Sequence, residues 1–491
     1  MSALLATMPG WQALFAAFAG CLWGIFGGAL PGISPSIAMA LLLPLTYGMD
    51  PVPAIVLLAS VYVGAEYGGS IPAILIRTPG TNSAAATTLD GYEMARQGRA
   101  GEALGISLMS GLVGGLVGLA FLVLATEPLA DLALRFTPPA YFALAVLGLS
   151  VIAGLSGGSL LKGLIAAGLG LMIATVGTDP VSGVPRFTFG EPDLLGGIRP
   201  ILVMVGLFAV AEMFAQINEP PWGKADARDT RLKLPGWRMQ RKLFRAQAIG
   251  CGIGTFEGVT PGAGGTVAAF MAYNEARRWS SEPEKFGHGA EEGVAAPEAA
   301  NNVVTATALV PLLSLGIPGS NSAAVLLGGF LVHGLQPGPM LFAKAPDVVN
   351  GLYWGLLFAN AAMFLLGLVI LTPAIWLVNR PKPYLLAAIL ALVVSGVFAI
   401  EQSLFDVGLV LGAGVLGYVL RLAGVPMLPM VLGVVLGFML ESNFRRSLVL
   451  SGDDPMIFLQ DPISLVLLLL AAAMTAWSLW REFAPNRTRD A

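Results

Sequence analysis

Stretches of about twenty consecutive apolar residues recur along most of this chain, and each is long enough to cross a lipid bilayer as a helix. The composition agrees with this interpretation, because 56% of the residues are hydrophobic and 12% are charged, whereas soluble domains contain about 25% charged residues. The sequence therefore predicts an all-α polytopic membrane protein with about 11–12 transmembrane spans plus re-entrant or interrupted helices. No nucleic acid is expected as a partner, because the chain has no basic arm or zinc-finger spacing.

The predicted spans form two sets, one in each half of the chain. They lie near 52–76, 102–126, 138–156, 158–177 and 197–218, and near 293–316, 347–372, 384–400, 404–422, 424–440 and 463–481. Each set follows an apolar segment that a Pro-Gly pair interrupts, and these interrupted hairpins are 11–47 and 246–278. The residues between the halves, 220–245, are polar and basic and predict a cytoplasmic linker. We therefore divide the chain into a first repeat, 1–219, this linker, and a second repeat, 246–491.

An internal duplication supports that division. The pattern Cys-x-x-Gly-x-Phe-x-Gly-x-x-Pro-Gly begins at Cys21 and, with identical spacing, at Cys251. A second pattern, Pro-Gly-Thr/Ser-Asn-Ser-Ala-Ala, begins at Pro79 in the motif loop 77–92 and at Pro318 in the motif loop 316–324. Because the two matches occur in the same order, gene duplication is preferred to chance.

Lys and Arg residues predict the orientation of the repeats, because cytoplasmic loops carry an excess of them. If the basic linker is inside, the loop 77–101 with its three arginines is also inside, while Arg445 and Arg446 are exceptions that fall outside. The loop at Pro79 then faces the cytoplasm and the loop at Pro318 faces outward, so the repeats are inverted. Inverted repeats are typical of transporters that open one central site alternately to each side. Some channels share the arrangement.

The Pro-Gly motifs also suit a binding site. Pro-Gly ends one half-helix and lets another begin, and the new N-terminus carries unpaired N–H groups and a partial positive charge that favour an anion such as a carboxylate. The candidate substrate-binding residues are Thr81, Asn82, Ser83, Asn301, Asn302, Ser320, Asn321 and Ser322. The candidate ion-coupling residues are Gly32, Ser34, Gly80, Gly262, Gly264, Gly319, Glu66 and Glu298. Each feature also has a structural interpretation: an isolated Pro-Gly pair makes a kink, Asn301 and Asn302 could bond neighbouring helices, and a buried carboxylate could pair with Arg77 or Lys162.

The order of these motifs resembles the large membrane subunit of the bacterial tripartite tricarboxylate transporters. The resemblance rests on Gly-Gly-Ala-Leu-Pro-Gly at 27–32, Tyr-Gly-Gly-Ser-Ile-Pro-Ala-Ile at 67–74, Thr-Pro-Gly-Thr at 78–81, Asp-Gly-Tyr at 90–92, Glu-Gly-Val-Ala-Ala-Pro-Glu-Ala-Ala-Asn-Asn at 292–302 and Leu-Gly-Ile-Pro-Gly at 315–319. It implies a multi-pass permease of the bacterial inner membrane that imports a tricarboxylate or related carboxylate by symport with Na⁺ or H⁺. It also implies two partners, a small four-helix membrane subunit and a periplasmic solute-binding protein, and no cofactor.

The paired re-entrant hairpins favour elevator-type alternating access, because such hairpins tend to keep the binding site within one moving unit. Two other classes of function stay open, namely an intramembrane enzyme acting on a hydrophobic substrate and a channel. The enzyme is disfavoured because the matches to catalytic patterns, Gly-x-Ser-x-Gly at 154–158 and Gly-x-Gly-x-x-Gly at 412–417, lie in or between apolar helices and not after a strand. We therefore expect a protein that is not an enzyme.

Overall fold

Helices make up almost all of the regular structure. The computed structural model describes residues 8–155, 159–179, 182–219, 231–260 and 264–483. The strands in this part of the chain are β1 (Gly177–Thr178) and β2 (Pro185–Arg186), which form one antiparallel pair. The predicted all-α class is confirmed.

Nine helical segments in the described ranges are long and apolar enough to span a membrane. They are Trp11–Ala29, Pro51–Ile76, Ala100–Ala133, Pro200–Ile217, Pro346–Val369, Lys382–Ala399, Leu404–Leu422, Met427–Ser451 and Pro462–Trp480. The other predicted spans are shorter helices. The segment 293–316 is divided between two helices, and Pro311 lies in the first turn of the second, where its ring cannot continue the preceding hydrogen-bond ladder.

The helices follow one another with few long connections. The first half contains α1 (Trp11–Ala29), α2 (Pro35–Leu42), η1 (Leu43–Gly48), α3 (Pro51–Ile76), η2 (Asn82–Ala85), α4 (Thr88–Arg96), α5 (Ala100–Ala133), α6 (Pro138–Leu155), α7 (Leu160–Ala174), η3 (Pro192–Leu194), α8 (Pro200–Val205), η4 (Gly206–Val210) and α9 (Ala211–Ile217). The second half contains α10 (Trp237–Val259), α11 (Gly264–Trp279), η5 (Pro283–Lys285), α12 (Glu291–Thr307), α13 (Leu309–Leu315), α14 (Asn321–Val332), α15 (Pro339–Lys344), α16 (Pro346–Val369), α17 (Leu371–Val378), α18 (Lys382–Glu401), α19 (Leu404–Leu422), α20 (Met427–Ser451), α21 (Ile457–Gln460) and α22 (Pro462–Phe483).

The two copies of the first motif pack in the same way. Helix α1 lies along α3, and α10 lies along α12. A Cβ atom on Gly24 would lie 2.3 Å from the carbonyl oxygen of Val61, and one on Gly254 would lie 2.4 Å from that of Ala300. Glycine is needed at both positions because the backbones approach too closely for any side chain. The duplicated glycines thus hold each hairpin against the long helix that follows it.

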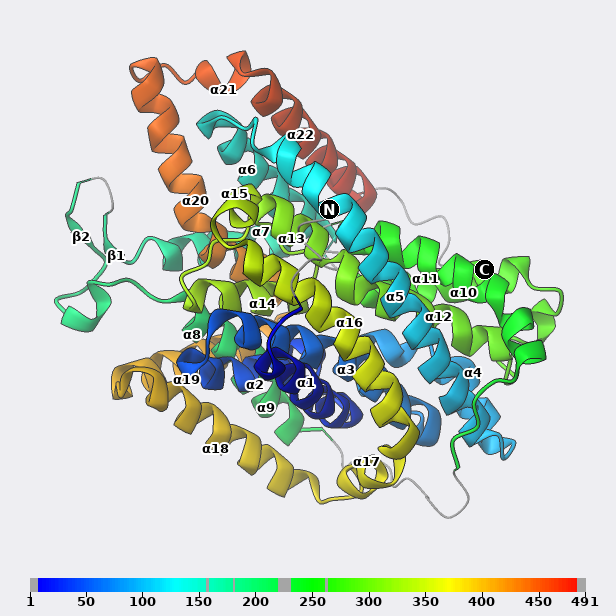
Figure 1. Ribbon diagram of the computed structural model, residues 1–491. Helices are drawn as coiled ribbons and strands as arrows, with labels where there is room; N and C mark the ends of the chain where they lie inside the picture. Colours follow the sequence, from blue (N-terminus) through cyan, green and yellow to red (C-terminus); the bar gives the residue numbers. More distant parts are fainter. Residues whose placement is uncertain (1–7, 156–158, 180–181, 220–230, 261–263, 484–491) are drawn as a thin grey trace.

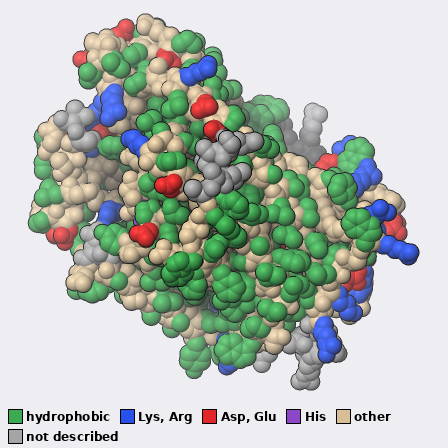
Figure 2. All heavy atoms as spheres, viewed as in Figure 1, with side chains coloured by type: hydrophobic (Ala, Val, Ile, Leu, Met, Phe, Trp, Pro, Cys, Tyr) green, Lys and Arg blue, Asp and Glu red, His purple; other side chains and the backbone are tan. Residues whose placement is uncertain are grey.

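The helices form two groups, which we call the motif bundle (α1–α5 and α10–α17) and the flanking helices (α6–α9 and α18–α22). Most contacts between the groups run through α2, η1 and α14 on one side and α8, η4, α18 and α20 on the other. Figure 1 places β1, β2 and α21 at the upper left and α4 and α17 at the lower right. Charged side chains gather toward these two ends, with a broad hydrophobic area between them (Figure 2). This distribution suits a membrane-spanning orientation.

Candidate functional site

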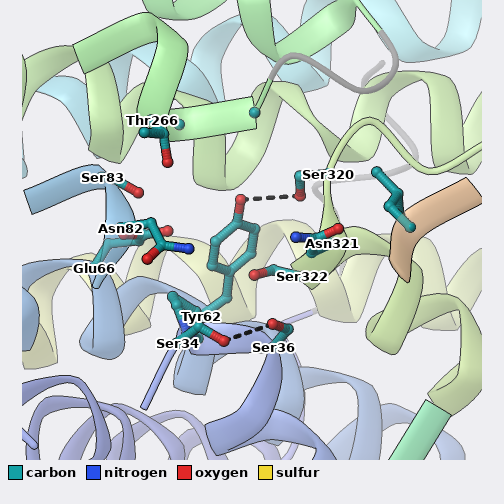
Figure 3. Close-up of a pocket in the computed structure, with 14 residues that line it drawn as sticks. Ser34, Ser36, Tyr62, Glu66, Asn82, Ser83, Thr266, Ser320, Asn321 and Ser322 are labelled. Atoms are coloured by element: carbon teal, nitrogen blue, oxygen red, sulfur yellow. Dashed lines mark hydrogen bonds between the residues drawn. The ribbon is translucent and has the colours of Figure 1, made fainter. Parts of the chain in front are cut away.

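Helix starts that follow the duplicated chain breaks meet at one place in the motif bundle (Figure 3). Three of them are capped by side chains predicted to form the site. The hydroxyl of Ser34 accepts a hydrogen bond from the N–H of Ile37 at the start of α2. In the same way, the hydroxyl of Thr81 accepts a hydrogen bond from the N–H of Ala84 at the start of η2. The hydroxyl of Ser320 accepts one from the N–H of Ala323 at the start of α14. Helix α11 contributes a fourth start, so partial positive charges converge on one region.

A cavity of about 110 Å³ lies between these helix starts. Of the predicted residues, it is lined by Ser34, Glu66, Asn82, Ser83, Gly264, Ser320, Asn321 and Ser322. It is also lined by Pro35, Ser36, Tyr62, Gly265, Thr266 and Leu428. The structure therefore brings substrate and ion candidates from both repeats into one cavity wall of hydroxyls, amides and one carboxylate.

The predicted glycines Gly80 and Gly319 do not line this cavity but set the path of the two motif loops. The N–H of Gly80 donates to the carbonyl of Gly69 at 3.0 Å, and that of Gly319 donates to the carbonyl of Ala308 at 3.3 Å. A Cβ on Gly80 would lie 1.8 Å from the carbonyl oxygen of Gly28. One on Gly319 would lie 2.5 Å from that of Gly258, the matching glycine of the second hairpin. Each loop therefore lies directly against the hairpin of its own repeat.

The predicted hairpin glycines have different surroundings. Gly32 has a φ of 84°, in the region that favours glycine. A Cβ there would lie 1.7 Å from Nε2 of Gln216, which comes from α9. Gly264 begins α11 with a φ of 66° and lines the cavity. Gly262 lies outside the described residues.

Two residues of α3 point into the cavity one helical turn apart. The hydroxyl of Tyr62 forms a 3.1 Å hydrogen bond with the hydroxyl of Ser320, which joins the two repeats (Figure 3). Glu66 is 4% exposed, and Asn301, Ser83 and Thr81 are the polar neighbours of its carboxylate. Its Oε2 atom makes no hydrogen bond within the described residues. A buried carboxylate in this position calls for a cation or a proton.

The adjacent amides Asn301 and Asn302 point to different neighbours. Both polar side-chain atoms of Asn301 are buried and make no hydrogen bond in the part of the chain that the structure describes. A Cβ on Gly265 would lie 2.7 Å from its Oδ1, so this amide adjoins the cavity wall. Asn302 instead donates to the backbone carbonyl of Glu298 at 3.0 Å and lies against Gly111 of α5. The structure thus associates the first amide with the cavity and the second with helix packing.

Glu298 lies outside the cavity wall, fully buried between α12, α3 and α5. Its carboxylate accepts hydrogen bonds from Ser70 at 2.7 Å, from Ser107 at 2.9 Å and from Thr87. Three hydroxyl groups therefore supply hydrogen bonds to this carboxylate, so that it needs no Lys or Arg partner. Its surroundings therefore differ from those of Glu66, although the sequence places both in apolar segments.

Three further polar residues, Ser36, Tyr62 and Thr266, line the cavity and were not among the predicted site residues. The repeat itself carried a signal for two of them, because Ser36 and Thr266 lie at matching positions beyond the two Pro-Gly pairs. Each stands four residues after the glycine of its Pro-Gly pair, so the duplicated pattern extends to both. Tyr62 carried no comparable signal, since it stands in an apolar helix whose sequence matches no binding pattern.

The cavity continues into a larger one of about 500 Å³, which we call the vestibule. The two share Ser34, Ser36, Asn82, Thr266, Asn321 and Leu428. The opposite wall of the vestibule comes from the flanking helices, through Glu212 of α9, Arg421 of α19 and the residues 425–427 at the start of α20. The candidate site therefore opens toward the boundary between the two groups of helices.

Comparison with known proteins gives a consistent result over almost the whole chain. Residues 14–432 match the family model described as "Tripartite tricarboxylate transporter TctA family". An uncharacterized 52.8 kDa protein in the TAR-I ttuC' 3'region of Agrobacterium vitis is 39% identical over 472 residues, which cover 96% of this chain and 94% of the relative. An uncharacterized protein in the TAR-II ttuC' 3'region of the same organism is 36% identical over 215 residues, which cover 44% of this chain and 89% of that relative. No solved structure matches the chain.

The family match and the longer relative agree with the sequence motifs, the helical fold and the duplicated chain breaks around one cavity. The chain belongs to the tripartite tricarboxylate transporter TctA family.

Proposed function

We propose that this chain is the permease through which a tricarboxylate or related carboxylate enters a bacterial cell by cation symport. One observation carries the proposal: helix starts from both repeats converge on a cavity lined by hydroxyl and amide groups. The described lining residues include no Lys or Arg. Backbone N–H groups, Asn82 and Asn321 would therefore supply the donors for the carboxylate oxygens. Membership of a transporter family supports transport over catalysis.

The coupling cation is assigned to Glu66. A carboxylate in the wall of the cavity repels a carboxylate substrate unless a cation or a proton neutralises it. Thr81, Ser83 and Asn301 are polar neighbours of Glu66 and each has a side-chain oxygen atom, and oxygen ligands of this kind suit a small hard cation. Binding of Na⁺ or H⁺ at Glu66 would thus favour binding of the carboxylate substrate beside Glu66. Transport of the substrate would in this way be coupled to transport of the cation.

The motif bundle is proposed to move as the elevator. Close glycine contacts join each hairpin to α3 or α12, whereas most contacts to the flanking helices run through α2, η1 and α14. The predicted inverted orientation of the repeats would supply two equivalent arrangements, one open to each side. In the arrangement described here, the site opens by the vestibule toward the end of α9 that precedes the basic linker, which is the cytoplasmic side in the predicted orientation.

The family implies a machine of three proteins. We assign the chain to the inner membrane, beside a small four-helix membrane subunit, with a periplasmic solute-binding protein that delivers the carboxylate. Proteoliposomes containing both membrane subunits would be tested for uptake of labelled citrate, succinate and benzoate, with the binding protein outside and an imposed Na⁺ or H⁺ gradient. Concentrative uptake of one of these acids that requires the binding protein is the expected result.

Site variants connect uptake to the cavity. Asn82→Ala and Asn321→Ala should each lower uptake at least about tenfold, because losing a hydrogen bond to a charged group costs about 1.5–3 kcal/mol. Asn274→Ala, at an exposed position of α11, is the matched control and should transport normally. Equal uptake by all three variants would contradict the assigned site. Chemical turnover without a gradient would favour an enzyme, and flux that does not saturate would favour a channel.

A further inference from the structure

Arg421 is the only Lys or Arg among the described residues that line the cavity and the vestibule. It lies near the C-terminal end of α19, and its side chain is 45% exposed. A carboxylate that leaves the cavity by the vestibule passes this guanidinium. Because a guanidinium has five N–H donors in a planar fork, it can hold a carboxylate while keeping another partner.

In this structure the guanidinium of Arg421 is paired with acidic side chains. Arg421 forms an ion pair with Glu212 of α9, and a second nitrogen lies 3.7 Å from Glu219. Glu212 also accepts a hydrogen bond of 2.9 Å from Gln216. The Gln216 side chain lies against Gly32, at the tip of the first hairpin. The ion pair is therefore connected both to the wall of the vestibule and to the re-entrant hairpin.

The second repeat contains a comparable pair. The residues from Pro200 to Glu212 and from Pro429 to Glu441 have the same spacing, each with its proline near the start of a flanking helix. Glu441 forms ion pairs with Arg186 at 2.7 Å and with Arg445 at 2.6 Å. Arg445 was one of the exceptions to the predicted orientation, and its acidic partners account for it. Glu212 and Glu441, which have the same spacing from a proline, thus each form an ion pair with arginine.

We propose that Arg421 is a second carboxylate-binding station, at the cytoplasmic mouth of the pathway, for which Glu212 competes with the departing substrate. The station rests on the proposed function, since it takes the same class of ligand, a small di- or tricarboxylate. The substrate carboxylate replaces Glu212 on the guanidinium during release. Glu212 then takes the position back, which limits rebinding from the cytoplasm.

The test measures the apparent KM separately on each face of the membrane. Proteoliposomes with the protein in a known orientation would exchange labelled citrate or succinate for the unlabelled acid, applied in turn to the binding-protein side and to the cytoplasmic side. Arg421→Ala should raise the cytoplasmic KM by up to about fivefold, the range for loss of a partly exposed charge pair. Glu212→Gln should lower that KM, because it frees Arg421. The KM on the other face should not change in either variant.

Arg421→Lys and Arg238→Ala complete the design. Lysine keeps the charge and should restore part of the cytoplasmic affinity, and Arg238 is an exposed residue of α10 outside both cavities. If Arg421 only anchors α19 to α9, Arg421→Ala and Glu212→Gln would shift the KM in the same direction or on both faces, and the station would be overturned. Normal exchange with an unchanged cytoplasmic KM would overturn the station alone. Absence of exchange by the unaltered protein would overturn the proposed function as well.

Discussion

Two buried glutamates show how much the surroundings of a residue decide. Glu66 and Glu298 both stand in apolar segments, where ionisable groups are rare and costly. Glu298 accepts hydrogen bonds from three hydroxyl groups. Glu66 faces the cavity with Oε2 unbonded in the described part of the chain. The arrangement around Glu298 stabilises the fold, whereas the carboxylate of Glu66 is available to an ion.

Replacing each glutamate by glutamine should therefore give opposite results. Glu66→Gln should leave thermal stability nearly unchanged and abolish the dependence of carboxylate uptake on the cation gradient, because a neutral amide cannot hold the cation. Glu298→Gln should lower the free energy of unfolding by about 1–3 kcal/mol, because its amide N–H₂ would face hydroxyl donors and leave a buried group unsatisfied.

The two variants would be compared by thermal unfolding in detergent and by uptake at several Na⁺ concentrations and pH values. Each serves as the control for the other, since the same chemical change is made at both positions. Uptake by Glu66→Gln that still follows the cation gradient would remove Glu66 from the coupling site.

At the level of helices, glycine contacts hold the two Pro-Gly hairpins in place. Gly24 and Gly254 lie at matching positions of α1 and α10, each against a backbone carbonyl of the neighbouring long helix. Gly252 lies on α10 too, but a Cβ there would meet nothing within 4 Å. The chain therefore offers its own comparison between a crowded and an open helical glycine.

Alanine substitution should separate these positions. Gly24→Ala and Gly254→Ala should each lower the free energy of unfolding by about 1–3 kcal/mol, the usual cost of overpacking. Gly252→Ala should be neutral or stabilising by up to about 1 kcal/mol, because alanine favours helix more than glycine does. Denaturation in detergent would measure all three, and equal effects would contradict the close approach of the hairpins.

An ion-pair cluster joins three helices at the end of the molecule predicted to be cytoplasmic. Glu291 at the start of α12 pairs with Arg99, which precedes α5, and with Lys242 of α10 at 3.2 Å. Burial raises the pKa of Glu291, but hydrogen bonds from Arg99 and Lys242 outweigh burial, and the pKa lies below its usual value. A lowered carboxyl pKa contributes stability above the unfolded-state pKa, and this stability is lost as the pH falls through the folded-state pKa.

Glu291→Gln should consequently lower stability near pH 7 by about 0.5–1 kcal/mol, the range for a partly exposed pair. The difference from the unaltered protein should disappear in acid, once Glu291 itself is protonated. Denaturation in detergent from pH 7 to pH values below the usual carboxyl pKa would show this, with Glu284→Gln at an exposed position as the control. A difference that does not depend on pH would rule out an electrostatic contribution.

At the scale of the whole molecule, the elevator proposal concerns the boundary between the motif bundle and the flanking helices. Gly396 of α18 faces Pro44 of η1 across this boundary, and a Cβ on Gly396 would lie 3.1 Å from that of Pro44. Gly355 of α16 faces Val56 of α3 inside the motif bundle at the same Cβ separation. Both separations are near the range that a disulfide spans.

Cysteine pairs at these positions should have different consequences in a protein whose Cys21 and Cys251 are replaced by alanine. Oxidation of Pro44→Cys with Gly396→Cys should stop uptake, because the crosslink fixes the motif bundle to the flanking helices. Oxidation of Val56→Cys with Gly355→Cys should leave uptake unchanged, and reduction should restore the first pair. Normal uptake by fully crosslinked Pro44→Cys with Gly396→Cys would exclude a large displacement at this boundary.

Much of the architecture could be predicted because its causes are local. Apolar length determined which segments became long helices, and Pro-Gly pairs determined where α1 and α14 are separated from their neighbours in the chain. The hydroxyls of Thr81 and Ser320, which cap η2 and α14, stand in the duplicated motif for the same reason, since a capping group lies within a few residues of the helix start that it serves. The duplicated sequence also indicated which segments should pack alike.

The sequence by itself determined the membrane class, the duplication, the chain breaks and the chemical types of residue near them. Only the tertiary structure decided that Glu66 lines the cavity while Glu298 packs between helices, and that Tyr62 faces Ser320 across the two repeats. The physical reason is that 94% of the apolar part of α3 is buried. Its sequence therefore has no polar face that would indicate which side chains point toward the cavity. When every side of a helix is buried, the neighbours that pack against each side determine which residues reach the site.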